Sequence, residues 1–194
     1  AKRTADEITA DIAALCLKLM GELGLSAADV EFAGMATPGT ANSVSGVIEY
    51  ANNLPFLNFP IAEIFKSYLP VSKVIIANDA NAAAVGEMTY GAARGMKNFI
   101  MITLGTGVGS GIVINGNVVY GHDGFAGELG HVTAVRSNGR SCNCGKTGCL
   151  EAYASAIGMA KTAREWLELS DEPSLLRSLD NITSKDVYEA AKEG

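Results

Sequence analysis

Apolar residues near the start of the chain recur at helical spacing. Four of them follow one another at steps of four, three and four: Ile8, Ile12, Leu15 and Leu19. This spacing places them on one face of a helix. The pattern stops at a glycine, so the helix is expected to end near Gly21 or Gly24.

The following segments alternate between apolar runs and turn-forming residues. Residues 30–36 predict a buried strand, and residues 37–58, rich in Gly, Pro, Asn and Ser, predict a long loop or an irregular hairpin. A short helix is expected over 61–68. A β-branched strand over 74–77 then runs through polar residues into an Ala-rich helix over 82–90. Ligands of α/β proteins gather at such carboxyl ends of strands.

The second half of the chain shows the same mixture of strands and helices. Asn115-Gly116 is a strong signal for a two-residue hairpin turn. Thr183, with Asp186 three residues later, predicts the start of a last helix. Four further elements are expected: strands over 99–104, 111–114 and 118–120, and a helix over 155–169.

Glycines occupy every second position after the strand over 99–104. They are Gly105, Gly107, Gly109 and Gly111. The dinucleotide fingerprint and the P-loop both fail here, because their further glycine or Gly-Lys-Ser/Thr is absent and a strand follows instead of a helix. A tight turn with positive φ would explain one glycine, whereas four in seven residues favour bare backbone that contacts phosphate.

Composition narrows the classes of partner. The chain has 194 residues, is 48% hydrophobic and carries a formal net charge of −6 from 15 basic and 21 acidic residues. This balance, without a Lys/Arg cluster, argues against a nucleic-acid surface. No apolar run reaches membrane-spanning length and no signal peptide is visible. The sequence therefore predicts a cytoplasmic protein without a nucleic-acid or membrane partner.

Three of the four cysteines crowd into eight residues. Cys142, Cys144 and Cys149 follow His131, and the spacing predicts a Cys₃His tetrahedral zinc site. Four protein ligands leave no open position, so this zinc would be structural. Unliganded reduced cysteines or a local disulfide are the alternatives. His122 is the other histidine, and nothing around it resembles a site.

Three carboxylates are candidates for chemistry. Asp79 lies where a strand meets a helix, and the sequence favours a helix N-cap and a general base equally. Glu128 and Glu151 flank the zinc ligands, so a zinc-fixed loop would present them rigidly. Taken singly, each of these two glutamates would be expected as a solvated surface charge.

Four segments in this order resemble the ROK family of bacterial sugar kinases and sugar-responsive repressors, and its glucokinases in particular. They are residues 78–87, 104–111, 128–131 and 142–151. The resemblance implies an α/β, actin-like ATPase (ribonuclease H-like) sugar kinase fold, truncated at both ends. Residues 1–77 would form part of the smaller α/β domain, and residues 78–194 the larger domain with the zinc-binding loop.

The resemblance also implies an activity and its residues. The activity is ATP-dependent phosphorylation of a hexose, glucose first, at the 6-hydroxyl, with Asp79 as catalytic base, Mg²⁺ as cofactor and a homodimer as assembly. The implied sugar ligands are Asn53, Asn78, Asp79, Glu128, His131 and Glu151. The implied contacts to ATP are Gly105, Thr106 and Gly107. The implied ligands of the structural Zn²⁺ are His131, Cys142, Cys144 and Cys149.

The sequence departs from the family pattern at both ends. The N-terminal phosphate-binding hairpin and the C-terminal glycine-rich adenosine segment are not visible, so the chain alone is expected to have little or no kinase activity. A sugar-sensing domain of a ROK-type repressor, or a kinase for N-acetylmannosamine or fructose, are the alternatives. No helix-turn-helix is visible, and the intact Asp79 favours a kinase because a sensor needs no base.

Overall fold

The computed structural model describes residues 3–51 and 53–193, and the chain divides into two compact units. The first unit comprises Ala1–Asn98 and Val113–Ala126, and the second comprises Phe99–Ile112 and Gly127–Gly194. These divisions fall at other places than the predicted boundary between residues 77 and 78, which stays a prediction.

Two small sheets build the first unit. Strand β1 (Ala33–Thr37) pairs in parallel with β5 (Val74–Asn78), so that Thr37 lies opposite Asn78. A second sheet is antiparallel and has the order β2-β3-β4. Its strands are Thr40–Asn42, Val47–Tyr50 and Leu57–Phe59. The irregular hairpin, one of the two alternatives for 37–58, matches β2 and β3, whose register shifts between Thr40 and Ala41. The pairing of β4 was missed, because this strand is short and follows turn residues.

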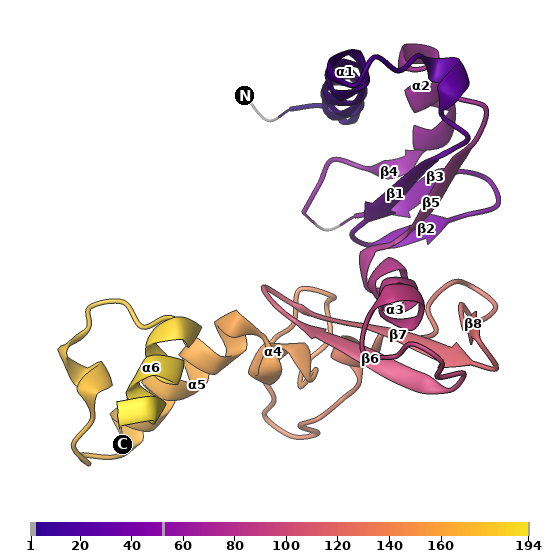
Figure 1. Cartoon of the computed structure of the whole chain (residues 1–194). Helices are drawn as coiled ribbons and strands as arrows, with labels where there is room; N and C mark the ends of the chain where they lie inside the picture. The colour runs from indigo at the N-terminus through magenta and orange to yellow at the C-terminus, as the bar shows by residue number, and fades with distance from the viewer. Residues whose placement is uncertain (1–2, 52, 194) are drawn as a thin grey trace. The chain divides into compact units, whose positions relative to one another are not determined.

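Helix α1 (Ala5–Glu22) is the predicted first helix, opened by a capping box between Thr4 and Glu7. Of its apolar stripe, Ile8 is partly buried against the core, but the other three residues are exposed. Ile12, Leu15 and Leu19 are 38%, 61% and 57% exposed, whereas Thr9 and Ala13 are buried. The buried stripe has the same helical spacing but smaller side chains, which allow α1 to approach α2 (Ile61–Tyr68), its neighbour in Figure 1.

The core of the first unit holds the strand that leads to the candidate site. Ile76 of β5 is buried with Ile48 of β3 and Phe56. Phe65 of α2 is buried in a second cluster with Leu69. Burying side chains of this size stabilises the fold by about 1.5–3 kcal/mol each. The buried Ile76 therefore anchors β5 in the core, two residues before the strand ends at Asn78.

Helix α3 (Asp79–Tyr90) follows β5 without a connecting loop, and it begins three residues before the predicted start at residue 82. The difference has a local cause. Asn78 is the N-cap, and its Oδ1 accepts the backbone N–H groups of Ala80 at 3.0 Å and Asn81 at 3.1 Å. An Asn cap satisfies the N–H groups of the first turn as well as Ser or Asp does. The polar residues from Asp79 to Asn81, expected to connect the strand to the helix, therefore belong to the helix.

The second unit contains the glycine turn and the cysteine-rich segment. Strand β6 (Phe99–Leu104) is as predicted, and β7 (Val108–Ile114) begins three residues before the predicted strand. Strand β7 runs on into the first unit, where it pairs with β8 (Asn117–Val118). The remaining elements are η2 (Leu129–His131), α4 (Glu151–Ala154), α5 (Ala156–Leu169), η3 (Leu175–Ser178) and α6 (Ser184–Glu193).

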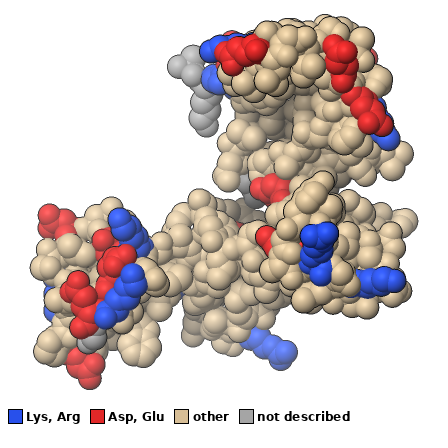
Figure 2. Space-filling model, in the orientation of Figure 1, with Lys and Arg blue, Asp and Glu red and all other residues tan. Residues whose placement is uncertain are grey.

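Helix α6 has the predicted start. Asp186 accepts the backbone N–H of Thr183 at 2.8 Å, and Thr183 accepts that of Asp186 at 3.3 Å. On the face drawn in Figure 2, acidic and basic side chains alternate over the region of α5 and α6. Among the residues described, no helix is both long and apolar enough to cross a membrane.

Candidate functional site

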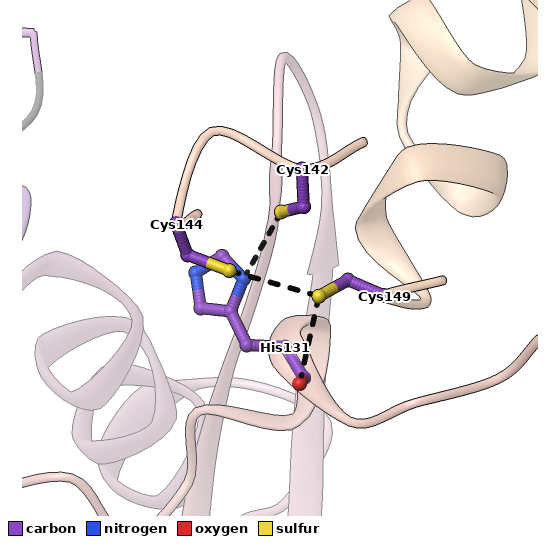
Figure 3. Close-up of side chains that lie close together, drawn as sticks. All are labelled: His131, Cys142, Cys144 and Cys149. Carbon is purple, nitrogen blue, oxygen red and sulfur yellow. Dashed lines mark hydrogen bonds between the residues drawn. The ribbon is translucent and has the colours of Figure 1, made fainter. Parts of the chain in front are cut away.

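The predicted metal ligands converge in the second unit. The side-chain ligand atoms of His131, Cys142, Cys144 and Cys149 all lie within 4.8 Å of one another (Figure 3). Cys142 Sγ is 3.6 Å from His131 Nδ1, and Cys144 Sγ is 3.6 Å from Cys149 Sγ. A tetrahedral zinc with Zn–S bonds of about 2.3 Å separates its ligands by about 3.7 Å. The donor set and its spacing therefore fit zinc.

Backbone pairing folds the loop that brings the three thiols together. Isolated bridges join Ser141 to Thr147 and Thr133 to Cys149. Gly145 has φ +88° and Gly148 has φ +78°, a region that L side chains avoid. A Cβ on Gly148 would also lie 1.8 Å from the carbonyl oxygen of Val135. The loop thus needs glycine at this position for both conformation and space.

Metal binding at this cluster has to displace thiol protons. Burial raises the pKa of the Cys142 thiol to about 12. The backbone of Cys144 lowers this pKa by hydrogen bonding, whereas the side chains of Cys144 and Cys149 raise it. Cys149 is fully buried, whereas Cys144 is exposed. A divalent cation replaces these protons as it binds, so the affinity for zinc falls as the pH falls.

The two ring nitrogens of His131 face different groups. Nδ1 lies toward the thiol of Cys142, while Nε2 lies 4.0 Å from a carboxylate oxygen of Glu128. Glu151 Oε1 is 3.9 Å from Cys142 Sγ. A metal bound to Nδ1 would fix the ring and leave Nε2 free to contact another molecule. The structure thus gathers Glu128, His131 and Glu151 around the metal ligands.

The glycine turn lies against Glu151. Glu151 Oε2 accepts the backbone N–H of Val108 at 2.9 Å, and a Cβ on Gly107 would lie 2.5 Å from the same oxygen. The four glycines at alternate positions are all described, and none of them has positive φ. The hypothesis that one of these glycines is needed for a tight turn with positive φ is therefore wrong. The close approach of a carboxylate explains Gly107 instead. Thr106 is exposed, and a Cβ on Gly105 would meet open space.

Ser110, which the sequence analysis did not single out, attaches η2 to β7. Its side chain is buried, donates to the carbonyl oxygen of Gly127 and accepts the backbone N–H of Leu129 at 3.2 Å. A Cβ on Gly130 would lie 2.1 Å from the carbonyl oxygen of Val108. Strand β7 thereby carries the Glu128–His131 turn. In the sequence, the available signal for this contact was a single serine between two glycines, Gly109 and Gly111.

The remaining predicted residues lie in the first unit. Asn78 Nδ2 donates to the carbonyl oxygen of Gly39 at 3.0 Å, while its Oδ1 caps α3. The N-cap interpretation of Asp79 is therefore wrong, because Asn78 does the capping. The Asp79 side chain is exposed, and its Oδ1 accepts only the N–H of Ala80, at 2.8 Å. Asn53 is also exposed, in the connection between β3 and β4.

Solved structures define the class of protein. A ROK family glucokinase from Streptomyces griseus in complex with glucose and AMPPNP has a TM-score of 0.76 and 33% identity, over 98% of this chain and 61% of that chain. A ROK family transcriptional regulator, a homologue of the E. coli MLC protein, has a TM-score of 0.84 and 27% identity, over 100% and 48%. These likenesses confirm the predicted α/β, actin-like sugar kinase fold.

Sequence comparison identifies the family to which the chain belongs. The ROK family matches residues 2–194, and the chain belongs to it. It is 43% identical over 187 residues to a glucokinase of Halalkalibacterium halodurans, which covers 95% of this chain and 56% of that protein. It is 35% identical over 165 residues to a xylose repressor of Caldicellulosiruptor bescii, over 83% and 40%. The chain thus spans about half the length of the curated relatives it matches.

Proposed function

We propose that this chain is the sugar-binding part of an ATP-dependent kinase that phosphorylates the 6-hydroxyl of a hexose, with glucose as the first substrate. The observation that carries the proposal is the exposed carboxylate of Asp79. The strand-to-helix joint exposes this group while Asn78 supplies the helix cap. The glucokinase relative at 43% identity and the glucose-bound glucokinase structure support the same assignment.

In this proposal Asp79 acts as the general base. Its carboxylate accepts the proton of the sugar 6-hydroxyl as that oxygen attacks the γ-phosphate of ATP. Asn78 holds the start of α3 and supports Asp79 from the preceding position. Asn78 and Asn53 are further sugar ligands in the proposal, each able to donate and to accept hydrogen bonds.

Sugar recognition by the second unit rests on Glu128, His131 and Glu151. Carboxylates and an imidazole nitrogen read hydroxyl groups well, because an analogue lacking one hydroxyl leaves a buried polar group unpaired. Zinc held by His131 and the three cysteines would supply no reaction step. It would fix the loop and the imidazole ring from which these contacts are made.

The glycine turn is proposed to contact ATP. Gly105 and Thr106 are exposed, and no side chain stands in front of Gly105. The Gly105 N–H itself donates to the carbonyl oxygen of Gly107 at 3.0 Å, so the backbone N–H of Thr106 is the donor proposed for phosphate. Mg²⁺ would neutralise charge on the transferring phosphates. Gly107 has the additional task of admitting Glu151 beside the turn, which brings a proposed sugar ligand close to the segment proposed to contact ATP.

A repressor's sugar-sensing domain is the second candidate. The transcriptional regulator structure, at TM-score 0.84, and the xylose repressor, at 35% identity, favour it. A sensor binds sugar without transferring phosphate, so it needs no base at position 79. N-acetylmannosamine and fructose remain alternative kinase substrates, and the proposed homodimer and cytoplasmic location remain predictions.

The deciding experiment measures ADP formation with ATP and a panel of glucose, mannose, fructose, glucosamine and N-acetylmannosamine. It uses this chain and, in parallel, the full-length gene product, each with Asp79→Asn as the matched control. Turnover that prefers glucose and is lost in the variant supports the glucokinase. Sugar binding without turnover in the full-length product would support the sensor instead. Robust turnover by this chain alone would contradict the expectation that it is inactive by itself.

A further inference from the structure

Arg140 joins the metal-binding loop to two helices. Its side chain is only 10% exposed. Nη1 donates to the carbonyl oxygens of Ala152 at 2.9 Å and Gly158 at 3.1 Å. Nη2 donates to Thr162 Oγ1 at 2.9 Å and to Glu165 Oε2 at 2.6 Å. One guanidinium thus bonds to α4 and to three positions of α5.

The backbone of Arg140 belongs to the loop itself. Its carbonyl oxygen accepts the N–H of Gly148 at 2.8 Å, one residue before the last metal ligand. Its N–H donates to the hydroxyl of Tyr153 at 2.8 Å, and its guanidinium lies 4.5 Å from the centre of the Tyr153 ring. Arg140 therefore contacts the middle two residues of α4, Ala152 and Tyr153.

Helix α4 is too short to orient itself. It consists of four residues, Glu151–Ala154, and a single turn gains too few internal hydrogen bonds to be stable alone. Its first residue is Glu151, the carboxylate that accepts the Val108 N–H beside the glycine turn. The direction in which Glu151 points is therefore set by what holds α4 from outside.

We propose that Arg140 is a positioning residue that holds α4 against the metal-binding loop and thereby aims Glu151 at the glycine turn. The consequence for sugar binding rests on the proposed function, whereas the effect on Glu151 does not. Guanidinium is suited to this task because its planar donors reach several acceptors in fixed directions, which an ammonium group cannot do.

The Val108 amide provides a readout that needs no sugar. Hydrogen exchange at this N–H reports its bond to Glu151. In Arg140→Gln, exchange at Val108 is expected to rise by about tenfold or more, because a charge-assisted hydrogen bond is weakened locally. Glu151→Gln marks the effect of disturbing the acceptor itself. Arg164→Gln is the matched control, since Arg164 bonds to Asn181 and Ile182 and should leave Val108 unchanged.

Two further variants keep the test decisive if Arg140→Gln unfolds. Arg140→Lys retains the positive charge but loses the planar set of N–H donors. It should raise hydrogen exchange at Val108 by a smaller factor than Arg140→Gln does. Glu165→Gln leaves Arg140 in place and removes one of its partners, so a small rise is expected. Unchanged Val108 exchange in these variants would overturn the proposal. So would an equal rise at Val108 and at all amides of β6 and α5, which would indicate a general loss of stability.

A kinetic measurement then separates this proposal from the proposed function. In an active full-length enzyme, Arg140→Gln should raise the KM for sugar by a larger factor than it lowers kcat, with the KM for ATP little changed. An increase confined to the KM for ATP would overturn the positioning of a sugar ligand. If no sugar is bound or phosphorylated at all, the proposed function fails, and the Val108 result still decides whether Arg140 positions Glu151.

Discussion

The candidate metal-binding loop and the strand-to-helix joint hold their candidate functional side chains in two different ways. At the joint, Asn78 and Asp79 are consecutive residues whose positions follow from β5, α3 and one cap. In the loop, His131 and Cys149 lie 18 residues apart and meet because turns, bridges and side chains fold the intervening chain back. Regular secondary structure builds the joint, whereas contacts between residues distant in sequence build the loop.

This difference predicts different sensitivities. A joint between a buried strand and a helix keeps its geometry when a single polar group is changed, because the core holds both elements. A loop that is held together by thiols and an imidazole has few apolar contacts of its own. Its stability is therefore expected to depend on a metal ion bound by these side chains. The predictions below test whether the two regions respond independently.

The largest effect is expected from removing the metal site. Cys149→Ser, or a strong chelator, should abolish tight zinc binding, since structural zinc contributes roughly 10–16 kcal/mol in small metal-bound folds. Hydrogen exchange should then increase through residues 131–151, while β1 and β5 of the first unit keep their protection. The measurement combines metal analysis with hydrogen exchange. Equal protection of the loop with and without zinc would contradict the prediction.

Asp79→Asn should produce the next largest effect, on the reaction alone. Loss of a general base lowers turnover by about 10²–10⁴-fold, whereas the fold should be unchanged because Asn78 remains the cap. Steady-state kinetics of the full-length protein and its circular dichroism test this together. Full activity in the variant would remove Asp79 from its proposed role, and altered zinc content would show that the two regions are not independent.

Gly107→Ala is expected to have an intermediate effect. The added methyl group meets Glu151 Oε2, the end of a flexible side chain, so the carboxylate moves away and gives up its hydrogen bond to the Val108 N–H, which contributes about 1 kcal/mol. Sugar affinity, followed by calorimetry, should fall while the melting temperature changes little. Gly105→Ala is the matched control, because its methyl group would meet open space. Equal behaviour of the two variants would contradict the close-approach explanation.

The smallest effect should come from removing the cap. Asn78→Ala deprives α3 of an N-cap and Gly39 of a donor, which should cost about 0.5–2 kcal/mol of stability. Urea unfolding measures this change, and Asn78→Asp should restore only the capping part, because aspartate caps equally well but has no N–H to donate to Gly39. Zinc content serves as the reference: it should match that of the unmodified chain in both variants.

The sequence was most informative where one local rule decides the structure. The helix 61–68 and the strand over 99–104 were predicted with their observed bounds, because apolar spacing and flanking breakers agree there. The prediction was incomplete over 37–58, where three short strands are separated by turn residues and the third was missed. The spacing also did not show which face of α1 packs, since two stripes on that helix have the same period.

The candidate metal site followed from the sequence because its ligands are chemically unusual and closely spaced. Cysteine and histidine in this arrangement have few other uses, so their convergence was expected before the fold was known. The partner of the glycine turn was not expected. Gly107 and Glu151 are 44 positions apart, and nothing in either segment shows that the bare backbone faces that carboxylate.

The amino-acid sequence by itself determined most of the elements, the family resemblance and the candidate metal ligands, because these depend on local spacing and on residue chemistry. The tertiary structure alone decided which apolar face of α1 is buried, that Asn78 rather than Asp79 caps α3, and that Arg140 reaches α4 and α5. The cap depends on the backbone conformation at one residue, and the other two depend on the distance between groups remote in the chain. Periodicity along a sequence carries no information about either.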